Sequence, residues 1–83
     1  MAHYHERNIG TCSSSVEFDL EDGVIHNVQF HGGCHGNLQA IGKLTEGKKA
    51  EEIIPLLSGI DCHGRGTSCG DQFAKALTRA LGK

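Results

Sequence analysis

The fold of this chain is decided by residues 15–30, SVEFDLEDGVIHNVQF. In the first half of this stretch, apolar side chains alternate with acidic ones at Val16, Phe18 and Leu20. Alternation with a period of two is typical of a half-buried strand, and it resumes over residues 24–30. Asp22-Gly23 lies between the two runs and is a strong signal for a tight turn, because both positions tolerate positive φ. The stretch therefore predicts an antiparallel hairpin.

The segments on either side of the hairpin predict one further strand and three helices. Upstream, residues 3–8 contain Tyr4 as an apolar anchor and predict a third strand. Downstream, the apolar spacing becomes helical, which predicts helices over residues 36–46, 50–57 and 69–81. The first should end at Gly47, the second should be short or kinked at Pro55, and the third should begin with a Ser-x-x-Asp cap at Ser68. The prediction is an α+β fold: a meander of two or three antiparallel strands followed by three helices packed on one face of the sheet.

Composition limits the classes of function. The chain has 83 residues, of which 37% are hydrophobic and 12 are glycine, so we expect one domain with a modest core that a metal or cross-link would help to stabilise. Its net charge of -2, with scattered basic residues, disfavours nucleic-acid binding. No apolar run approaches the roughly 20 residues of a spanning helix, which disfavours a membrane protein. No apolar signal segment stands at Met1, so we expect a cytoplasmic protein with reduced thiols.

Four cysteines are set in runs of small, turn-forming residues: Cys12, Cys34, Cys62 and Cys69. Cysteines placed in loops suit metal binding, and four thiolates satisfy the tetrahedral geometry of Zn²⁺, with iron as a second choice. Free or redox-active thiols and a pair of disulfides are the alternatives that the count leaves open. All three interpretations require the four loops to converge.

Residues beside the cysteines could support such a site. Cys34 and Cys69 stand at predicted helix starts, where unpaired N–H groups and the positive end of the dipole stabilise a thiolate. His35 and His63 each follow a cysteine and could replace a thiolate or donate a hydrogen bond to one. Asp71 either caps the last helix or joins the site. The other histidines are expected on the surface or on strand faces: His3, His5, His26 and His31.

No catalytic residues are predicted. The chain has no paired-carboxylate, nucleotide-cradling or serine-nucleophile pattern, and a cysteine followed directly by histidine does not establish a nucleophile and its base, because adjacent side chains usually point apart. The sequence therefore indicates no self-contained active site.

Residues 67–71, TSCGD, resemble the motif that gives the TSCPD domain its name, and residues 32–37, GGCHGN, look like the second glycine-cysteine motif of that family. Cys12 and Cys62 fall where the other cysteines of the family do, so the resemblance covers the whole chain as one domain, residues 1–83. Gly70 and His35 stand where the family usually has proline after cysteine, which leaves those helix starts less preorganised.

The resemblance implies a small cysteine-rich, zinc-binding accessory or interaction domain. TSCPD domains occur alone and at the C-terminus of vitamin B12-dependent ribonucleotide reductases, so it implies a protein partner of the ribonucleotide reductase type. Any reductase chemistry would then belong to a large catalytic domain that this chain lacks.

A more distant similarity links residues 22–48 to iron-sulfur cluster scaffold proteins of the NifU type. It implies a NifU-like meander-plus-helices fold and leaves two alternatives to the zinc hypothesis. One is an iron-sulfur scaffold or carrier. The other is a thiol-redox protein that uses Cys62 and Cys69, which share one loop.

Overall fold

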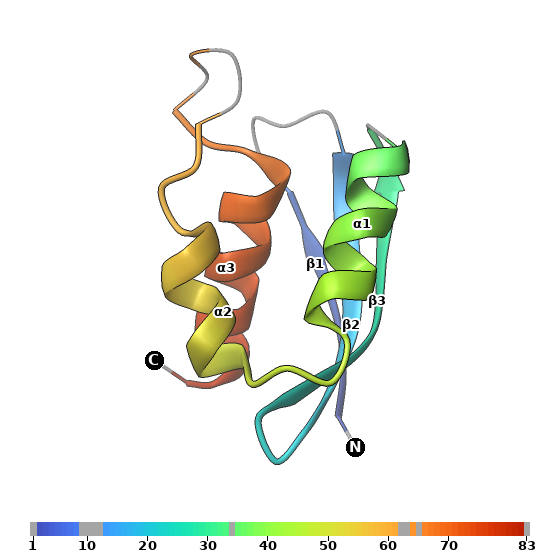
Figure 1. Cartoon of the computed structure of the whole chain (residues 1–83), viewed down its shortest axis with the longest axis vertical. Helices are drawn as coiled ribbons and strands as arrows, with labels where there is room; N and C mark the ends of the chain where they lie inside the picture. The colour runs from blue at the N-terminus through green and yellow to red at the C-terminus, as the bar shows by residue number, and fades with distance from the viewer. Residues whose placement is uncertain (1, 9–12, 34, 62–63, 65, 83) are drawn as a thin grey trace.

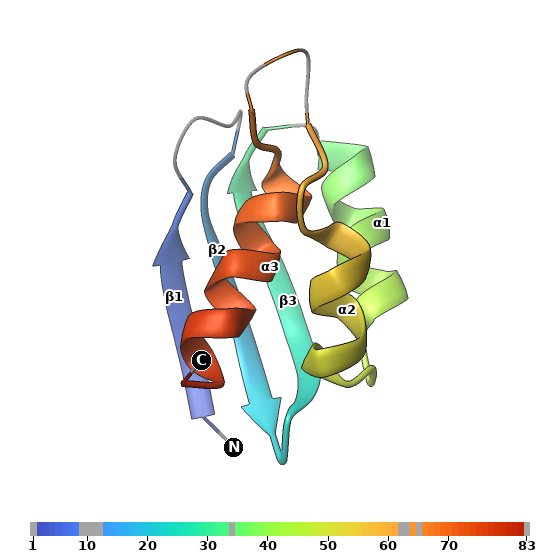
Figure 2. The ribbon, with the colours of Figure 1, turned by 90° about the vertical axis from the view of Figure 1, so that its left-hand side faces the viewer.

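The computed structural model describes residues 2–8, 13–33, 35–61, 64 and 66–82 of the chain. The elements follow one another as β1 (Ala2–Arg7), β2 (Ser13–Glu21), β3 (Val24–Gly32), α1 (His35–Thr45), α2 (Ala50–Leu57) and α3 (Cys69–Ala80). The strands form one antiparallel sheet in the order β1-β2-β3, and the helices lie together on one face of it (Figure 1, Figure 2). The predicted α+β fold is confirmed, including the third strand. Within the described ranges, no helix has the length and apolar character needed to cross a membrane.

The hairpin turn is the one that the sequence predicted. Asp22 and Gly23 connect β2 to β3 with φ values of 53° and 79°. Successive positive φ values define the turn whose twist matches that of the flanking strands. The turn therefore sets the start of the β2–β3 register, with Glu21 opposite Val24.

The helix boundaries also follow local signals. Gly47, with φ 76°, stands two residues beyond the last residue of α1, and α2 is short, at eight residues with Pro55 inside it. At the start of α3, the Ser68 hydroxyl accepts a hydrogen bond from the backbone N–H of Asp71 at 3.0 Å. This satisfies one of the N–H groups that a helix leaves unpaired at its first turn.

The core lies between the sheet and α3 and centres on aromatic rings. Phe73 of α3 is fully buried, and its ring makes edge contacts with Phe18 of β2 and Phe30 of β3, with centroids 5.5 and 5.7 Å apart. Tyr4 of β1 stacks on Phe18 at 5.4 Å. Edge-to-face and offset pairs add to the burial of apolar area. The remaining buried members of the core are Val16, Leu20, Ile25, Ala50, Ile53, Ala76 and Leu77.

One β-bulge interrupts the alternation in β3. Glu17 pairs with Gln29 while Asp19 pairs with His26, so β3 has one residue more than β2 over this span. Asn27 has φ 56° there, a value that asparagine tolerates better than most residues. The extra residue lets Ile25 and Val28, three apart in sequence, both face the helices.

Glu46, directly after α1, connects this bulge to the helical layer through contacts of its carboxylate. Its Oε1 accepts a hydrogen bond from the backbone N–H of Asn27 at 2.8 Å, and its Oε2 lies 2.7 Å from Nδ1 of His26. The Asn27 N–H and then His26 lower the pKa of Glu46, against desolvation and the nearby charge of Asp19, which raise it. The carboxylate therefore interacts better with the folded protein than its protonated form does.

We predict that Glu46→Gln lowers the free energy of unfolding at pH 7. The difference between the variant and the unchanged protein should disappear at acidic pH. The pKa of Glu46 is lowered by folding from its ordinary value of 4.5, so its stabilising effect is present above that pH and is lost as the pH falls through the lower value in the folded protein. Urea denaturation at neutral and acidic pH measures this. Glu21→Gln, which removes an exposed carboxylate at the end of β2, is the matched control for the loss of one surface charge. A constant difference at every pH would contradict the prediction.

Candidate functional site

Of the four cysteines predicted as metal ligands, Cys69 lies among the described residues. It is the first residue of α3 and is 8% exposed. The predictions for Cys12, Cys34, Cys62 and His63 fall outside the described residues, as does the side chain of His35. Cys69 stands at a helix start, as predicted from the Ser-x-x-Asp pattern.

A short chain of buried polar contacts leads from Asn8, directly after β1, to Cys69. The Ser13 hydroxyl, at the start of β2, donates a hydrogen bond to Sγ of Cys69 at 2.8 Å, and Nδ2 of Asn8 donates to Oγ of Ser13 at 2.7 Å. All three residues are less than 9% exposed. A hydrogen bond from a hydroxyl fixes the position of Sγ, the atom through which cysteine binds metals. The contacts connect two strands to the start of α3.

Asn8 carries an unpaired polar atom beside this chain of contacts. Its Oδ1 is buried and has no hydrogen-bond partner among the described residues. Leaving a buried acceptor unpaired costs about 1–3 kcal/mol, and such atoms often mark a water molecule or an ion. The surroundings of Asn8, beside Cys69, therefore suit a further group such as a water molecule or an ion.

A second bulge, in β2, turns Ser13 toward the helices. Ser13 pairs with Gly32 and Ser15 pairs with His31, so β2 has Ser14 as an extra residue between them. Side chains alternate along a strand, so without the extra residue Ser13 would share the open face with Ser15. The bulge is what brings the Ser13 hydroxyl to Cys69.

Asp71 holds both ends of the segment that contains Cys62. Its Oδ1 accepts from the backbone N–H of Gly59 at 2.7 Å, and its Oδ2 accepts from the Thr67 hydroxyl at 2.5 Å. Lys75 lies 3.2 Å from Oδ2. The hydroxyl of Thr67, followed by the Gly59 N–H, lowers the pKa of Asp71. Both oxygens of this buried carboxylate have partners, so Asp71 closes the loop.

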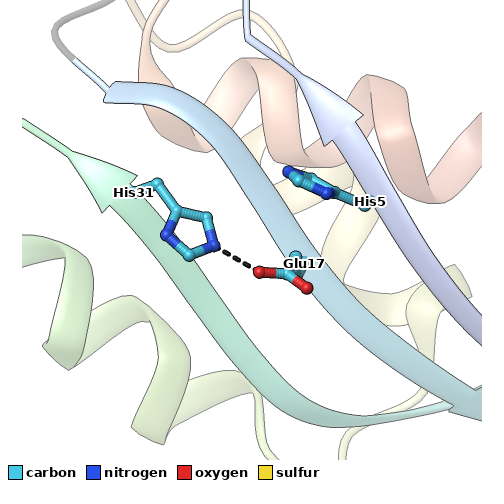
Figure 3. Close-up of side chains that lie close together, drawn as sticks. All are labelled: His5, Glu17 and His31. Carbon is cyan, nitrogen blue, oxygen red and sulfur yellow. Dashed lines mark hydrogen bonds and ion pairs between the residues drawn. The ribbon is translucent and has the colours of Figure 1, made fainter.

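A different cluster lies on the open face of the sheet. His5 of β1, Glu17 of β2 and His31 of β3 offer ligand atoms that all lie within 4.8 Å of one another, and Nε2 of His31 contacts Oε2 of Glu17 (Figure 3). His31 first and then His3 lower the pKa of Glu17. These three residues could hold a metal ion.

The sequence analysis placed these histidines on the surface or on strand faces and did not group them. Alternation along each strand assigns them to the polar face, but the register decides which residues meet. In this sheet His5 pairs with Glu17, whereas His31 pairs with Ser15. A shift of one residue would move a whole set of side chains to the other face.

The fold and the site together define a class: small α+β domains in which a meander of three strands is backed by helices and a cysteine opens the last helix. The TSCPD domain matches residues 1–81, and the chain belongs to the TSCPD domain family. No curated protein and no solved structure matches the chain. The similarity to NifU-type scaffolds is not shown by these comparisons and stays a prediction from the sequence.

Proposed function

We propose that this chain is a zinc-binding accessory domain in which four cysteines hold one Zn²⁺: Cys12, Cys34, Cys62 and Cys69. The observation that carries the proposal is the contact of Ser13 with Cys69. Ser13 directly follows Cys12 in the sequence, and it pairs with Gly32, two residues before Cys34. Consecutive Cα atoms are about 3.8 Å apart, so the proposal requires Cys12 and Cys34 to bind the ion from the chain directly beside Ser13 and Gly32.

The arrangement of the elements supports a zinc site at the same end of the molecule for all four ligands, including Cys62. The start of β2, the end of β3 and the start of α3 lie together there (Figure 1, Figure 2). Cys62 belongs to the segment between Gly59 and Thr67, and the Asp71 carboxylate binds both of those residues. Thiolates about 2.3 Å from a tetrahedral Zn²⁺ would cross-link the sheet to the helices.

Zinc would also supply stability that the modest core needs. A chain of 83 residues buries a limited core, and structural zinc contributes its binding free energy to folding. Reduced thiols are required for this, so we propose a cytoplasmic location, where thiols stay reduced. The resemblance to the C-terminal domain of ribonucleotide reductases supports a reductase chain as the partner.

We expect anaerobically purified protein to retain one zinc ion per chain through chelator treatment and gel filtration. Cys69→Ser should release that zinc and unfold at markedly lower urea concentration, because the metal's binding free energy is then lost from folding. Elemental analysis with urea denaturation measures both effects. The loaded protein should also bind a reductase catalytic chain in titration calorimetry, and Cys69→Ser should lose that binding.

Ile53→Val is the matched control for loss of zinc through simple destabilisation. It trims a buried residue of α2 and should cost about 0.5–1.5 kcal/mol while keeping the zinc. Iron with sulfide and visible absorption would replace the zinc proposal with an iron-sulfur scaffold. Folded, metal-free protein that cycles between a dithiol and a Cys62–Cys69 disulfide would replace it with thiol-redox function.

A further inference from the structure

Three side chains of kinds that can bind metals, two imidazoles and a carboxylate, meet on the face of the sheet that the helices leave uncovered. His5 and Glu17 are directly opposite each other on β1 and β2, and His31 on β3 is opposite Ser15, one step along the same face. Direct neighbours have Cβ atoms about 5 Å apart and diagonal neighbours about 7–8 Å, which long side chains can bridge. Glu17 on the central strand therefore lies between two imidazoles.

The distances fit a metal ion after small side-chain rotations. The three ligand atoms lie within 4.8 Å of one another. Nitrogen and oxygen ligands about 2.0–2.1 Å from a tetrahedral ion stand about 3.3 Å apart, so the widest pair would close by at most about 1.5 Å. His5 is exposed, and the side chains of Glu17 and His31 are 25% and 41% exposed, so the rings can rotate and an ion can enter from solvent.

Neighbouring side chains already orient the carboxylate. His3 lies between two acids, with Nε2 at 3.1 Å from Oε1 of Glu17 and Nδ1 at 2.6 Å from Oδ1 of Asp19. The hydroxyl of Ser15 is 3.1 Å from Nε2 of His5. Partners of this kind hold metal ligands in position, and Asp19 adds a second negative charge close by. The cluster has the supporting contacts that a metal site requires.

We propose that His5, Glu17 and His31 form a second metal site, which binds one divalent transition-metal ion of the Zn²⁺ type. Imidazole and carboxylate ligands suit Zn²⁺, Ni²⁺ and Cu²⁺, whereas Mg²⁺ and Ca²⁺ prefer oxygen ligands throughout. Three protein ligands leave the fourth position to water or to a donor from another molecule, unlike the closed four-cysteine centre. The site is exposed, so its ion should exchange readily.

The test measures how much zinc the full chain binds after chelator treatment, in addition to any ion that the treatment leaves bound. Equilibrium dialysis with Zn²⁺ should show one additional ion per chain, and Mg²⁺ should not compete for it. His5→Ala, Glu17→Gln and His31→Ala should each weaken this binding by at least about 10-fold, since even residues that only support a metal ligand contribute 10–100-fold. These side chains are at least partly exposed, and circular dichroism with thermal melting confirms that each variant is folded.

His26→Ala is the matched control, because His26 is another β3 histidine paired with a glutamate, Glu46, outside the cluster. It should bind the additional zinc as the unchanged protein does. In NMR spectra, the imidazole signals of His5 and His31 should shift on adding Zn²⁺ while those of His26 should not. Equal weakening by His26→Ala, or equal shifts of all the imidazoles, would show non-specific uptake and overturn the proposal. His5, Glu17 and His31 are unchanged in Cys69→Ser, so the same NMR titration of this variant, in buffer where circular dichroism shows it folded, tests the second site independently of the cysteine centre.

Discussion

Phe73→Ala should remove about 3–5 kcal/mol from the free energy of unfolding, the cost of deleting a fully buried aromatic ring. The ring is 0% exposed and joins α3 to two strands through Phe18 and Phe30. The free energy of unfolding of a domain is roughly 0.05–0.15 kcal/mol per residue, so a chain of 83 residues has a stability of about 4–12 kcal/mol in total. The loss is therefore a large fraction of the stability, and urea denaturation followed by far-UV circular dichroism should show it.

Leu44→Ala is the control for truncating an apolar side chain. Leu44 is 74% exposed, so its change should stay within about 0.5 kcal/mol. The loss of unfolding free energy in Phe73→Leu should lie between those of Phe73→Ala and Leu44→Ala, because leucine keeps most of the apolar volume while losing the ring contacts. A cost below 1 kcal/mol for Phe73→Ala would mean that the aromatic cluster does not hold α3 to the sheet.

Asp71→Ala should cost about 2–4 kcal/mol, because it removes the charged acceptor of two part-buried hydrogen bonds, from the Gly59 N–H and the Thr67 hydroxyl. The loop between these residues would lose its closure at the start of α3. We therefore expect faster hydrogen exchange at the Gly59 amide. If Cys62 binds the proposed zinc, the ion should also be released faster to a chelator.

Lys75→Ala separates the buried contacts of Asp71 from its surface ion pair. The Lys75 side chain is 54% exposed and lies 3.2 Å from Oδ2 of Asp71, and exposed pairs contribute about 0–1 kcal/mol. This variant should keep the protection of the Gly59 amide. Unchanged exchange at Gly59 in Asp71→Ala would contradict the role of Asp71 as the residue that closes the loop.

The two faces of the sheet have different physical roles. The helices cover the apolar face and exclude water from it, so single truncations there are costly. The open face has histidines and carboxylates in contact across strands, where side chains can rotate and exchange partners with solvent. A structural metal centre suits the first environment, and an exchangeable ion suits the second.

Local signals explain why the secondary structure was predictable from the sequence. The Asp22-Gly23 turn, the alternation from Val16 to Leu20 and the Ser68 cap each depend on neighbouring residues alone, and the structure confirms all three. The sequence also singled out Cys69 at a helix start and placed the histidines on strands or surfaces. It left open whether Asp71 caps a helix or joins the site.

Contacts between distant residues were decided by the tertiary structure alone. The bulges at Ser14 and Asn27 set which side chains face the helices, and no local sequence pattern predicted these bulges. The bulge at Ser14 brings the Ser13 hydroxyl to Cys69, 56 residues away in sequence. The register likewise gathers His5, Glu17 and His31, because alternation gives each residue a face but strand pairing gives it neighbours. The sequence by itself therefore determined the elements and their polar and apolar faces, while the pairing of the strands and the packing of α3 decided which groups meet.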